Sequence, residues 1–359
     1  MLHAMIMAGG GGTRFWPRSR QQRPKQFLTF SGDRTLLQST VDRIAAQVPP
    51  ERTWVVTGEA YRAETVAQLP ELPADHVVGE PMGRDTAACI GLGAALIARV
   101  DADATMMVMP ADHVIEPVAE FGRAALAAEQ FANDYPNALL TFGIPPTYPA
   151  IGYGYIRRGK ELGTRNGVGI AAATQFMEKP VFAVAEEYVA SGDYYWNSGI
   201  FVWKPHTILA QLKQRKPDLF ARVQRIADAW DTPRRAEVFQ AEYATAEKIS
   251  IDFAVMQDAP EVLVMHAPYT WDDVGSWLAL ERRNPQDADG NTVQALHCGV
   301  ETANCVIAAD PGHLIATIGV KDLVIVQCGN ATLIADRTKE ADVKRIVDKL
   351  KAGGQAEYL

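Results

Sequence analysis

Glycine and basic residues with phosphate-binding chemistry are concentrated in the first thirty positions of the chain. The apolar residues 5–8 are followed by Gly9, Gly10, Gly11 and Gly12, and then by Thr13 and Arg14. Further basic side chains occupy positions 18, 20, 23 and 25. Because glycine has no Cβ atom, a phosphate group can approach the backbone N–H groups of such a loop closely. The segment therefore predicts a site for a polyanion.

Two common phosphate-binding motifs do not fit this glycine loop. The dinucleotide motif G-x-G-x-x-G would need a further glycine at Arg14 or Phe15, depending on where the motif begins. The Walker A motif would need Gly-Lys-Ser/Thr at its end, and that sequence is absent. Pro17 and Pro24 stiffen the basic segment, which we expect to act as a lid that becomes ordered on nucleotide binding.

Carboxylates follow several apolar stretches that we predict to be strands. Asp112 follows residues 105–109, where a strand would deliver it to the edge of a parallel sheet as a ligand for Mg²⁺. His113 beside it is open to a packing, capping or catalytic role. Of the adjacent Asp272 and Asp273, we expect one to face the site and the other to face away or cap a helix.

Glu80 follows the short apolar stretch 77–78. One carboxylate can accept hydrogen bonds from two neighbouring donors of a ligand. Asp85 and Thr86 precede an alanine-rich helix, so either residue is a natural N-cap as well as a candidate contact for the nucleotide.

Three segments carry groups suited to a sugar phosphate. Gly152 and Gly154 flank Tyr153 and permit a close approach of the backbone to a hexose. The pair Glu178–Lys179 combines an acceptor for sugar hydroxyls with a point charge for a phosphate. Asn197 offers both a donor and an acceptor.

The composition excludes several classes of protein. With 35 basic and 43 acidic residues the chain has a net charge of −8, which argues against a nucleic-acid binder. The longest nearly apolar run, 87–98, is too short to span a bilayer. The four cysteines show neither C-x-x-C nor zinc spacing and indicate a reducing compartment. No signal peptide is visible, and we expect a cytoplasmic protein without a membrane partner.

Apolar strand patterns alternate with helical patterns over most of the chain. Strands are predicted at 53–57, 77–78, 105–109, 138–142, 171–176, 199–203 and 262–265. Helices are predicted at 36–47, 86–100, 117–133, 181–190, 205–213 and 276–283. This alternation predicts an α/β fold with a mostly parallel sheet and helices on both faces.

A cluster of proline, aspartate, glycine and asparagine at 284–291 marks a break in this pattern. Short strands follow at 306–308, 314–318, 323–326 and 331–334, and the segment 340–351 has a helical period. We therefore expect a catalytic domain at 1–285 and a small β-rich domain at 286–359 that ends in a helix.

Taken together, these motifs resemble the sugar-nucleotide pyrophosphorylases and, among them, the guanylyltransferases that act on mannose 1-phosphate. The matching segments are 7–28, 80–87, 110–113, 151–156, 178–180, 196–201, 250–253 and 271–277. Asp85 stands where the family has asparagine, and Ile151 stands where it has threonine. The C-terminal part resembles the family more weakly.

The resemblance implies a Rossmann-like nucleotidyltransferase domain and a short left-handed β-helix domain, without the isomerase domain of bifunctional relatives. It implies direct, Mg²⁺-assisted, in-line transfer of GMP from GTP to mannose 1-phosphate, in a homodimer. Arg14, Lys25 and Lys179 would be catalytic. Gly9, Gly10, Gly12, Thr13, Glu80, Asp85 and Thr86 would bind the nucleotide. Tyr153, Gly154, Glu178 and Asn197 would bind the sugar. Asp112 and Asp273 would bind the metal, because the family motif selects the second aspartate of the pair.

Two alternatives stay open at this point. The chain is also compatible with another sugar-1-phosphate nucleotidyltransferase, using UTP, dTTP or a glucose phosphate. A non-catalytic regulatory homologue that binds a sugar nucleotide is the second alternative. The joint presence of Arg14, Lys25, Asp112, Lys179 and Asp273 argues against it.

Overall fold

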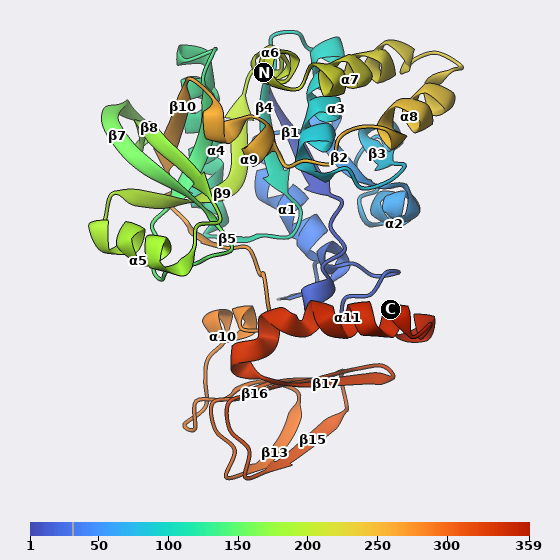
Figure 1. Ribbon diagram of the computed structural model, residues 1–359, viewed down its shortest axis with the longest axis vertical. Helices are drawn as coiled ribbons and strands as arrows, with labels where there is room; N and C mark the ends of the chain where they lie inside the picture. The colour runs from blue at the N-terminus through green and yellow to red at the C-terminus, as the bar shows by residue number, and fades with distance from the viewer. Residues whose placement is uncertain (31) are drawn as a thin grey trace. The chain divides into compact units, whose positions relative to one another are not determined.

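The computed structural model describes residues 1–30 and 32–359, which form two compact units (Figure 1). Unit 1 consists of residues 1–9, 38–111 and 115–271, and unit 2 consists of residues 10–37, 112–114 and 272–359. The chain passes between the units after residues 9, 37, 111, 114 and 271, so that α1 (Leu36–Ile44), β5 (Val114–Glu116) and β11 (Thr270–Asp272) each have residues in both. Most of the glycine loop therefore folds with the C-terminal residues. The domain boundary between 285 and 286 stays a prediction.

Unit 1 is built on a nine-stranded sheet with the order β3-β2-β1-β4-β9-β6-β10-β8-β7. Its strands are β1 (Leu2–Ala8), β2 (Thr53–Gly58), β3 (Val77–Glu80), β4 (Thr105–Pro110), β6 (Leu139–Ile144), β7 (Gly154–Arg165), β8 (Val168–Glu178), β9 (Tyr194–Trp203) and β10 (Val262–His266). The first four strands in the order are parallel. Because β9 is antiparallel to both β4 and β6, strands β6 and β10 run in the same direction as β4. The predicted mostly parallel α/β sheet is confirmed.

Helices cover the sheet of unit 1 (Figure 1). They are α2 (Glu59–Gln68), α3 (Asp85–Val100), α4 (Val118–Asp134), α5 (Phe182–Ser191), α6 (Pro205–Arg215), α7 (Pro217–Ala229), α8 (Arg235–Ala244) and α9 (Ile251–Ala254). Every residue of α3 from 87 to 97 is buried. A Cβ atom at Gly93 would lie 2.9 Å from the Met5 side chain, so this glycine lets α3 lie close to β1. The helix and the central strand together form the core of the unit.

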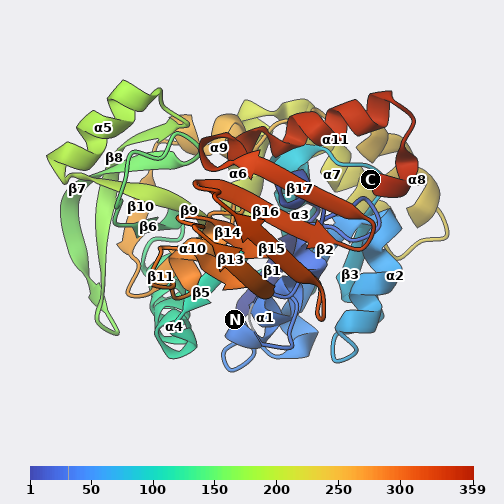
Figure 2. The ribbon, with the colours of Figure 1, turned by 90° about the horizontal axis from the view of Figure 1, so that it is seen from below.

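Unit 2 contains short strands and the C-terminal helix (Figure 2). One sheet has the order β12-β14-β16-β17, from β12 (Thr292–Gln294), β14 (Val306–Ala308), β16 (Leu323–Cys328) and β17 (Ala331–Asp336). A second sheet pairs β13 (Leu296–Val300) with β15 (Leu314–Ile318) in parallel. The helices are α10 (Ala279–Arg283), α11 (Val343–Ala352) and the short turns η1 (Thr13–Phe15), η2 (Lys25–Phe27), η6 (Arg337–Asp342) and η7 (Ala356–Tyr358). The predicted β-rich C-terminal part that ends in a helix is thus confirmed.

Several elements differ from the sequence-based prediction. Strand β7 and helices α2, α7 and α8 were not predicted, and the helix expected at 276–283 begins only at Ala279. Most of β7 beyond Ile156 is exposed and polar, so its sequence shows no alternation of apolar and polar residues that would predict a strand. It is held in the sheet by its pairing with β8 and β9. Among the helices of the described residues, none has the length and apolar character needed to cross a membrane.

Candidate active site

The predicted site residues are divided between the two units, and each group is described within its own unit. Unit 1 holds Gly9, Glu80, Asp85, Thr86, Tyr153, Gly154, Glu178, Lys179 and Asn197. Unit 2 holds Gly10, Gly12, Thr13, Arg14, Lys25, Asp112 and Asp273. Each group has its own contacts, which indicate what its side chains can do chemically.

Glu80 is a buried carboxylate at the carboxyl end of β3, with 5% of its surface exposed. The hydroxyl of Tyr243, in α8, donates a short hydrogen bond to its Oε1 atom. A Cβ atom at Gly9 would lie only 3.0 Å from Oε2, so the end of β1 runs directly beside this oxygen. Burial raises the pKa of Glu80 to about 7, although the bond from Tyr243 opposes the rise. Tyr243 was missed from sequence because it lies 163 positions away in no recognisable motif.

Asp85 and Thr86 begin α3, but neither caps it by the expected bond. Arg84 holds the N-cap position, and no side-chain capping bond is present there. Asp85 has a left-handed backbone (φ 64°), a conformation that asparagine and aspartate tolerate better than most residues. Thr86 Oγ1 accepts from the backbone N–H of Ile251 at 2.8 Å, and so ties the helix to the first residue of α9. The capping expectation was therefore wrong for Thr86.

Lys179 lies at the end of β8 next to Glu178. Its Nζ atom is 2.8 Å from Glu178 Oε1, and its backbone N–H donates to the carbonyl of Tyr153 at 3.2 Å. Partial burial lowers the pKa of the ammonium, but the bond to Glu178 outweighs it and raises the pKa above its ordinary value. Lys179 is therefore a permanent cation, and 58% of its side chain is exposed for an anion to reach. A Cβ atom at Gly154 would lie 2.6 Å from Glu178 Oε2, which explains a glycine there.

Asn197 is held in one orientation by its neighbours. Its Oδ1 atom accepts from Thr141 Oγ1 at 3.0 Å, and its Nδ2 atom donates to Asp252 Oδ1 at 3.0 Å. The Nδ2 atom has two N–H groups, and the bond to Asp252 uses one of them, so the other can donate to a ligand. Burial raises the pKa of Asp252 to about 7, and the nearby Glu178 carboxylate adds to the rise. Asp252 lies in the segment 250–253 that resembles the family, yet the sequence alone assigned it no role.

Tyr153 is packed among aromatic rings. The rings of Trp196 and Trp271 meet it edge to face, each with a centroid distance of 5.2 Å. Trp196 is buried. The position of Tyr153 is thus set by ring contacts, while its carbonyl accepts from Lys179. Tyr153, Gly154, Glu178 and Lys179 are brought together around the start of β7 and the end of β8.

In unit 2, Lys25 links the two predicted metal ligands. Its buried Nζ atom donates to Asp112 Oδ2 at 2.7 Å and to the backbone carbonyl of Asp273 at 2.5 Å. Burial opposes ionisation of Asp112, but Lys25 and then His113 lower its pKa below the ordinary value. Gly12 has a positive φ of 56°, and a Cβ atom there would lie 2.3 Å from Lys25 Cβ. Gly12 is therefore required for Lys25 to occupy this place.

The paired aspartates have different surroundings. Asp272 accepts two bonds from Arg282, at 2.7 and 2.9 Å, and one from the backbone N–H of Val274. The Asp272 carboxylate therefore stabilises the turn between residues 272 and 274. The carboxylate of Asp273 lies over Gly275, where a Cβ atom would come within 2.7 Å of Oδ2. The choice of Asp273 over Asp272 as the metal ligand stays a prediction.

The donor set fits Mg²⁺, although no group of three metal-ligating side chains occurs among residues 1–30 and 32–359. Mg²⁺ needs only one or two carboxylates when substrate phosphates and water supply the other ligands. Lys25 occupies Oδ2 of Asp112, and Oδ1 lies 3.9 Å from His113 Nε2, beyond hydrogen-bond distance. That Asp112 and Asp273 hold the metal together stays a prediction.

The remaining basic residues of the signature segment, which we define as residues 10–28, divide into two kinds. Arg14 and Thr13 are exposed in η1, as are Gly10 and Gly11 before them. Arg18, in contrast, donates to the carbonyl of Ala309 at 3.3 Å and lies over the ring of Trp277. The expectation that the whole basic run faces a polyanion was therefore too broad.

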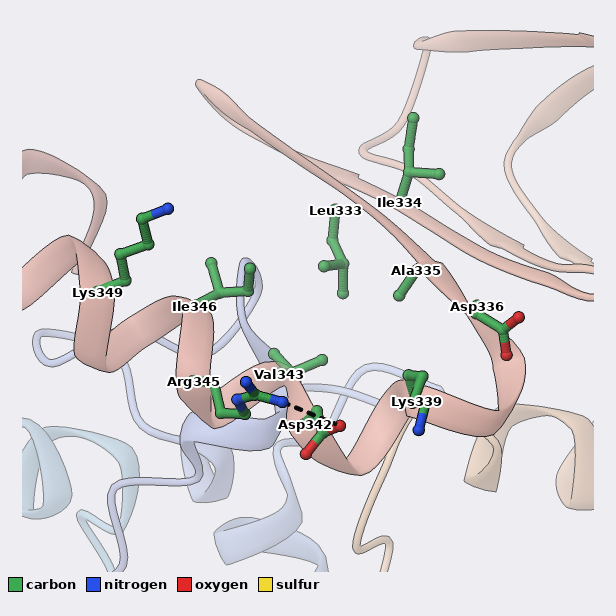
Figure 3. A pocket seen from close by; sticks show the side chains of 10 residues that line it. All are labelled: Leu333, Ile334, Ala335, Asp336, Lys339, Asp342, Val343, Arg345, Ile346 and Lys349. Atoms are coloured by element: carbon green, nitrogen blue, oxygen red, sulfur yellow. Dashed lines mark ion pairs between the residues drawn. The ribbon is translucent and has the colours of Figure 1, made fainter.

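A cavity of about 550 Å³ lies in unit 2 between β17 and α11. Its apolar side includes Leu333, Val343 and Ile346, while Arg345 and Lys349 lie along α11 (Figure 3). None of the predicted site residues lines it. Size alone thus does not identify the candidate active site, whose parts are identified by their charged and polar side chains.

Comparison with known proteins gives matches over both parts of the chain. The family described as nucleotidyl transferase matches residues 3–290, and the mannoseP isomerase/GMP-like beta-helix domain matches residues 296–350. The chain is 40% identical to the mannose-1-phosphate guanylyltransferase ManC of Salmonella typhimurium, over 99% of this chain and 75% of that protein. It is 39% identical to the mannose-1-phosphate guanylyltransferase of Escherichia coli, with the same coverage.

A solved structure of similar fold is that of a mannose-1-phosphate geranyltransferase, as it is described, from Thermus thermophilus. Its TM-score is 0.85 at 34% sequence identity, and the match covers 98% of this chain and 99% of that one. The similarity therefore extends through both the sheet domain and the β-rich C-terminal part.

Proposed function

Since the chain belongs to the nucleotidyl transferase family, we propose that it is an enzyme that transfers GMP from GTP to α-D-mannose 1-phosphate. The products are GDP-mannose and pyrophosphate. The identity of about 40% over nearly the whole chain to proteins named mannose-1-phosphate guanylyltransferase supports this activity. The observation that carries the choice of guanine is the buried Glu80 carboxylate, whose Oε2 atom lies beside Gly9, the residue that follows β1. Guanine presents two donors side by side, N1–H and N2–H₂, and one carboxylate can accept from both.

The reaction is a direct in-line displacement, in which a phosphate oxygen of the sugar phosphate attacks the α-phosphorus of GTP and pyrophosphate leaves. Two anions must be held together against their repulsion, so positioning and charge neutralisation supply most of the catalysis. Lys25 and Arg14 are assigned to the triphosphate, and Lys179 is assigned to the phosphate of the sugar. Asp112 and Asp273 would hold Mg²⁺, whose positive charge would offset the negative charge of the phosphates.

Hexose recognition is assigned to the cluster around the end of β8. The oriented Asn197 amide has one N–H for a sugar hydroxyl, because its other polar contacts are taken by Thr141, Gly199 and Asp252. Glu178 accepts from hydroxyls while it holds Lys179 in place. Tyr153 and Gly154 let the backbone approach the ring. Gly10, Gly12 and Thr13, together with Asp85 and Thr86, complete the nucleotide-binding set.

Pyrophosphate release across the four nucleoside triphosphates tests this proposal. Each triphosphate would be supplied with mannose 1-phosphate, glucose 1-phosphate or no acceptor, in the presence of Mg²⁺. The highest kcat/KM is expected for GTP with mannose 1-phosphate, and chelation of the metal should abolish release. A preference for UTP or dTTP would mean that the chain catalyses the same reaction with a different nucleotide. Absence of pyrophosphate release with every pair of substrates would refute the enzymatic assignment.

We also propose a cytoplasmic homodimer that has neither nucleic acid nor a membrane as a partner. The net charge of −8 supports the lack of nucleic-acid binding, because a basic face is the usual footprint of that function. Light scattering of the purified protein gives the oligomeric state directly. A molar mass of one chain at micromolar concentration would contradict the dimer.

A further inference from the structure

The last residues of the chain hold the signature segment through hydrogen bonds that the proposed chemistry does not use. Trp16 Nε1 donates to the backbone carbonyl of Tyr358 at 2.7 Å. Arg20 Nη1 donates to the backbone carbonyl of Glu357 at 3.2 Å. Both acceptors belong to η7, and all of these residues lie within unit 2. A segment near the start of the chain is thus fastened to its C-terminal end.

Arg20 donates to four protein acceptors in this arrangement. Its Nε atom donates to the carbonyl of Pro17 at 3.2 Å. Its Nη2 atom donates to the carbonyl of Cys328 at 3.3 Å and to Oδ1 of Asn330 at 2.8 Å. With Nη1 on Glu357, every nitrogen of the guanidinium has a protein acceptor. Arg20 therefore has a positioning geometry and not that of a group awaiting a phosphate.

The anchoring continues into the core of unit 2. Phe15 and Trp16 are buried in a cluster that includes Trp277, Val306 and Val326. Trp277 Nε1 donates to the carbonyl of Trp16 at 3.2 Å. Helix α11 lies against η1, the turn that carries Thr13 and Arg14. The signature segment therefore has part of its hydrophobic core and of its hydrogen bonds in the C-terminal region.

The glycines before this anchor cannot hold the segment in place themselves. An added Cβ atom would meet nothing within 4 Å at Gly10 or Gly11, so their surroundings are open. Glycine also loses more conformational freedom on ordering than any other residue. The position of Arg14 must therefore be set from the residues that follow it, of which Phe15 and Trp16 are the first to be buried.

We propose that Trp16 and Arg20, with the carbonyls of residues 357 and 358, form a C-terminal clamp that positions Arg14 and Lys25 for the triphosphate. The C-terminal region then contributes to catalysis by holding the signature segment, in addition to its role in folding. The inference rests on the proposed function for the roles of Arg14 and Lys25. The clamp itself rests on contacts within unit 2.

The test combines three clamp variants with two controls. Trp16→Phe removes the indole donor but keeps an aromatic ring, Arg20→Gln removes the fork of donors, and a third variant lacks residues 356–359. Glu357→Ala is the matched control for the deletion, because it removes a side chain and keeps the carbonyl that accepts from Arg20. Arg345→Gln removes an arginine from α11 whose side chain is 81% exposed and pairs only with Asp342 in the contacts described.

Two readouts separate positioning from general destabilisation. Hydrogen exchange of residues 10–28 should become faster in the clamp variants and stay as in the parent protein in both controls. Loss of one neutral hydrogen bond corresponds to roughly a two- to tenfold change, so kcat/KM for GTP should fall by about that factor in Trp16→Phe. The KM for mannose 1-phosphate should stay within about twofold of the parent value, because the residues assigned to the sugar lie in unit 1.

Unchanged exchange of residues 10–28 in folded Trp16→Phe and Arg20→Gln proteins would overturn the clamp. Equal increases in the KM values for both substrates would also overturn it, because they would indicate general loosening. If the parent protein releases no pyrophosphate from GTP, the proposed function fails, while the exchange experiment still decides whether the clamp exists. Should the deletion variant fail to fold, the two point variants decide the result alone.

Discussion

The buried Glu80 carboxyl group should make the free energy of unfolding depend on pH, and Glu80→Gln should remove this dependence. The folded protein raises the pKa of Glu80 from 4.5 to about 7, chiefly by burial. The unfolded chain keeps the ordinary value, so the folded state binds the Glu80 proton more tightly. Stability from this group is therefore fully present below about pH 4.5 and is lost as the pH rises through 7. Glutamine keeps the shape of the side chain and has no proton to lose.

The size of the effect follows from the shift. The difference between about 7 and 4.5 is about 2.5 pKa units, and each unit corresponds to about 1.36 kcal/mol. Between pH 5 and pH 8 most of this change takes place, which corresponds to about 2 to 3 kcal/mol in the free energy of unfolding. Tyr243 can still donate to the amide oxygen of glutamine, so its bond to position 80 contributes little to the difference.

The assay is urea unfolding of the parent protein and Glu80→Gln at several values between pH 5 and pH 8. Relative to the variant, the parent should lose about 2 to 3 kcal/mol over this range. Glu187→Gln is the matched control, because Glu187 is exposed on α5 and its replacement should leave the pH profile unchanged. A difference between parent and Glu80→Gln that stays flat with pH would refute the raised pKa and its cause in burial.

Three further predictions concern the reaction. Glu80→Gln should reduce the ratio of kcat/KM for GTP to kcat/KM for UTP. The expected loss corresponds to about 1.5 to 3 kcal/mol, the range for a hydrogen bond to a charged group. An unchanged GTP/UTP ratio would show that Glu80 does not contact the base. Lys179→Ala should raise the KM for mannose 1-phosphate far more than the KM for GTP, whereas Lys25→Ala should chiefly lower kcat; equal effects on both substrates would contradict the assignment of Lys179. Asp112→Asn and Asp273→Asn should each lower kcat severely with circular dichroism unchanged, and the double variant should be little worse, because residues that serve one ion are not additive. Fully additive losses would exclude a shared metal site.

Helices and strands that are buried on one face or on both faces were predictable from the sequence. β1, β4 and β6 are almost wholly buried, and their continuous apolar runs are typical of central parallel strands. Helix α3 was found because alanine and apolar residues fill positions 87–98, interrupted only by Gly91 and Gly93. β7 was not found, because charged side chains cover most of its surface and its pairing partners lie elsewhere in the chain.

The candidate site was predictable only as far as each motif is local. Glu178 and Lys179 are adjacent in sequence, and the structure keeps them together in an ion pair. The hydroxyl of Tyr243 on Glu80 joins residues 163 positions apart, and the bond between Lys25 and Asp112 joins residues 87 positions apart. Nothing in the sequence around these residues indicates their partners, because the order of the strands and the burial of side chains bring the partners together only in the folded chain.

The basic signature segment shows most directly why charge counted along a sequence overestimates the charge available to a ligand. Arg14 is exposed, but Lys25 is paired with Asp112, and Arg18 and Arg20 donate to backbone carbonyls. Every residue carries a carbonyl acceptor, so no sequence pattern indicates which carbonyl an arginine will bind. An arginine that donates to such acceptors has fewer N–H groups left for a ligand. Within residues 10–28, the basic side chains that are exposed are those of Arg14 and Arg23, and the placement of Arg14 depends on the buried residues that follow it.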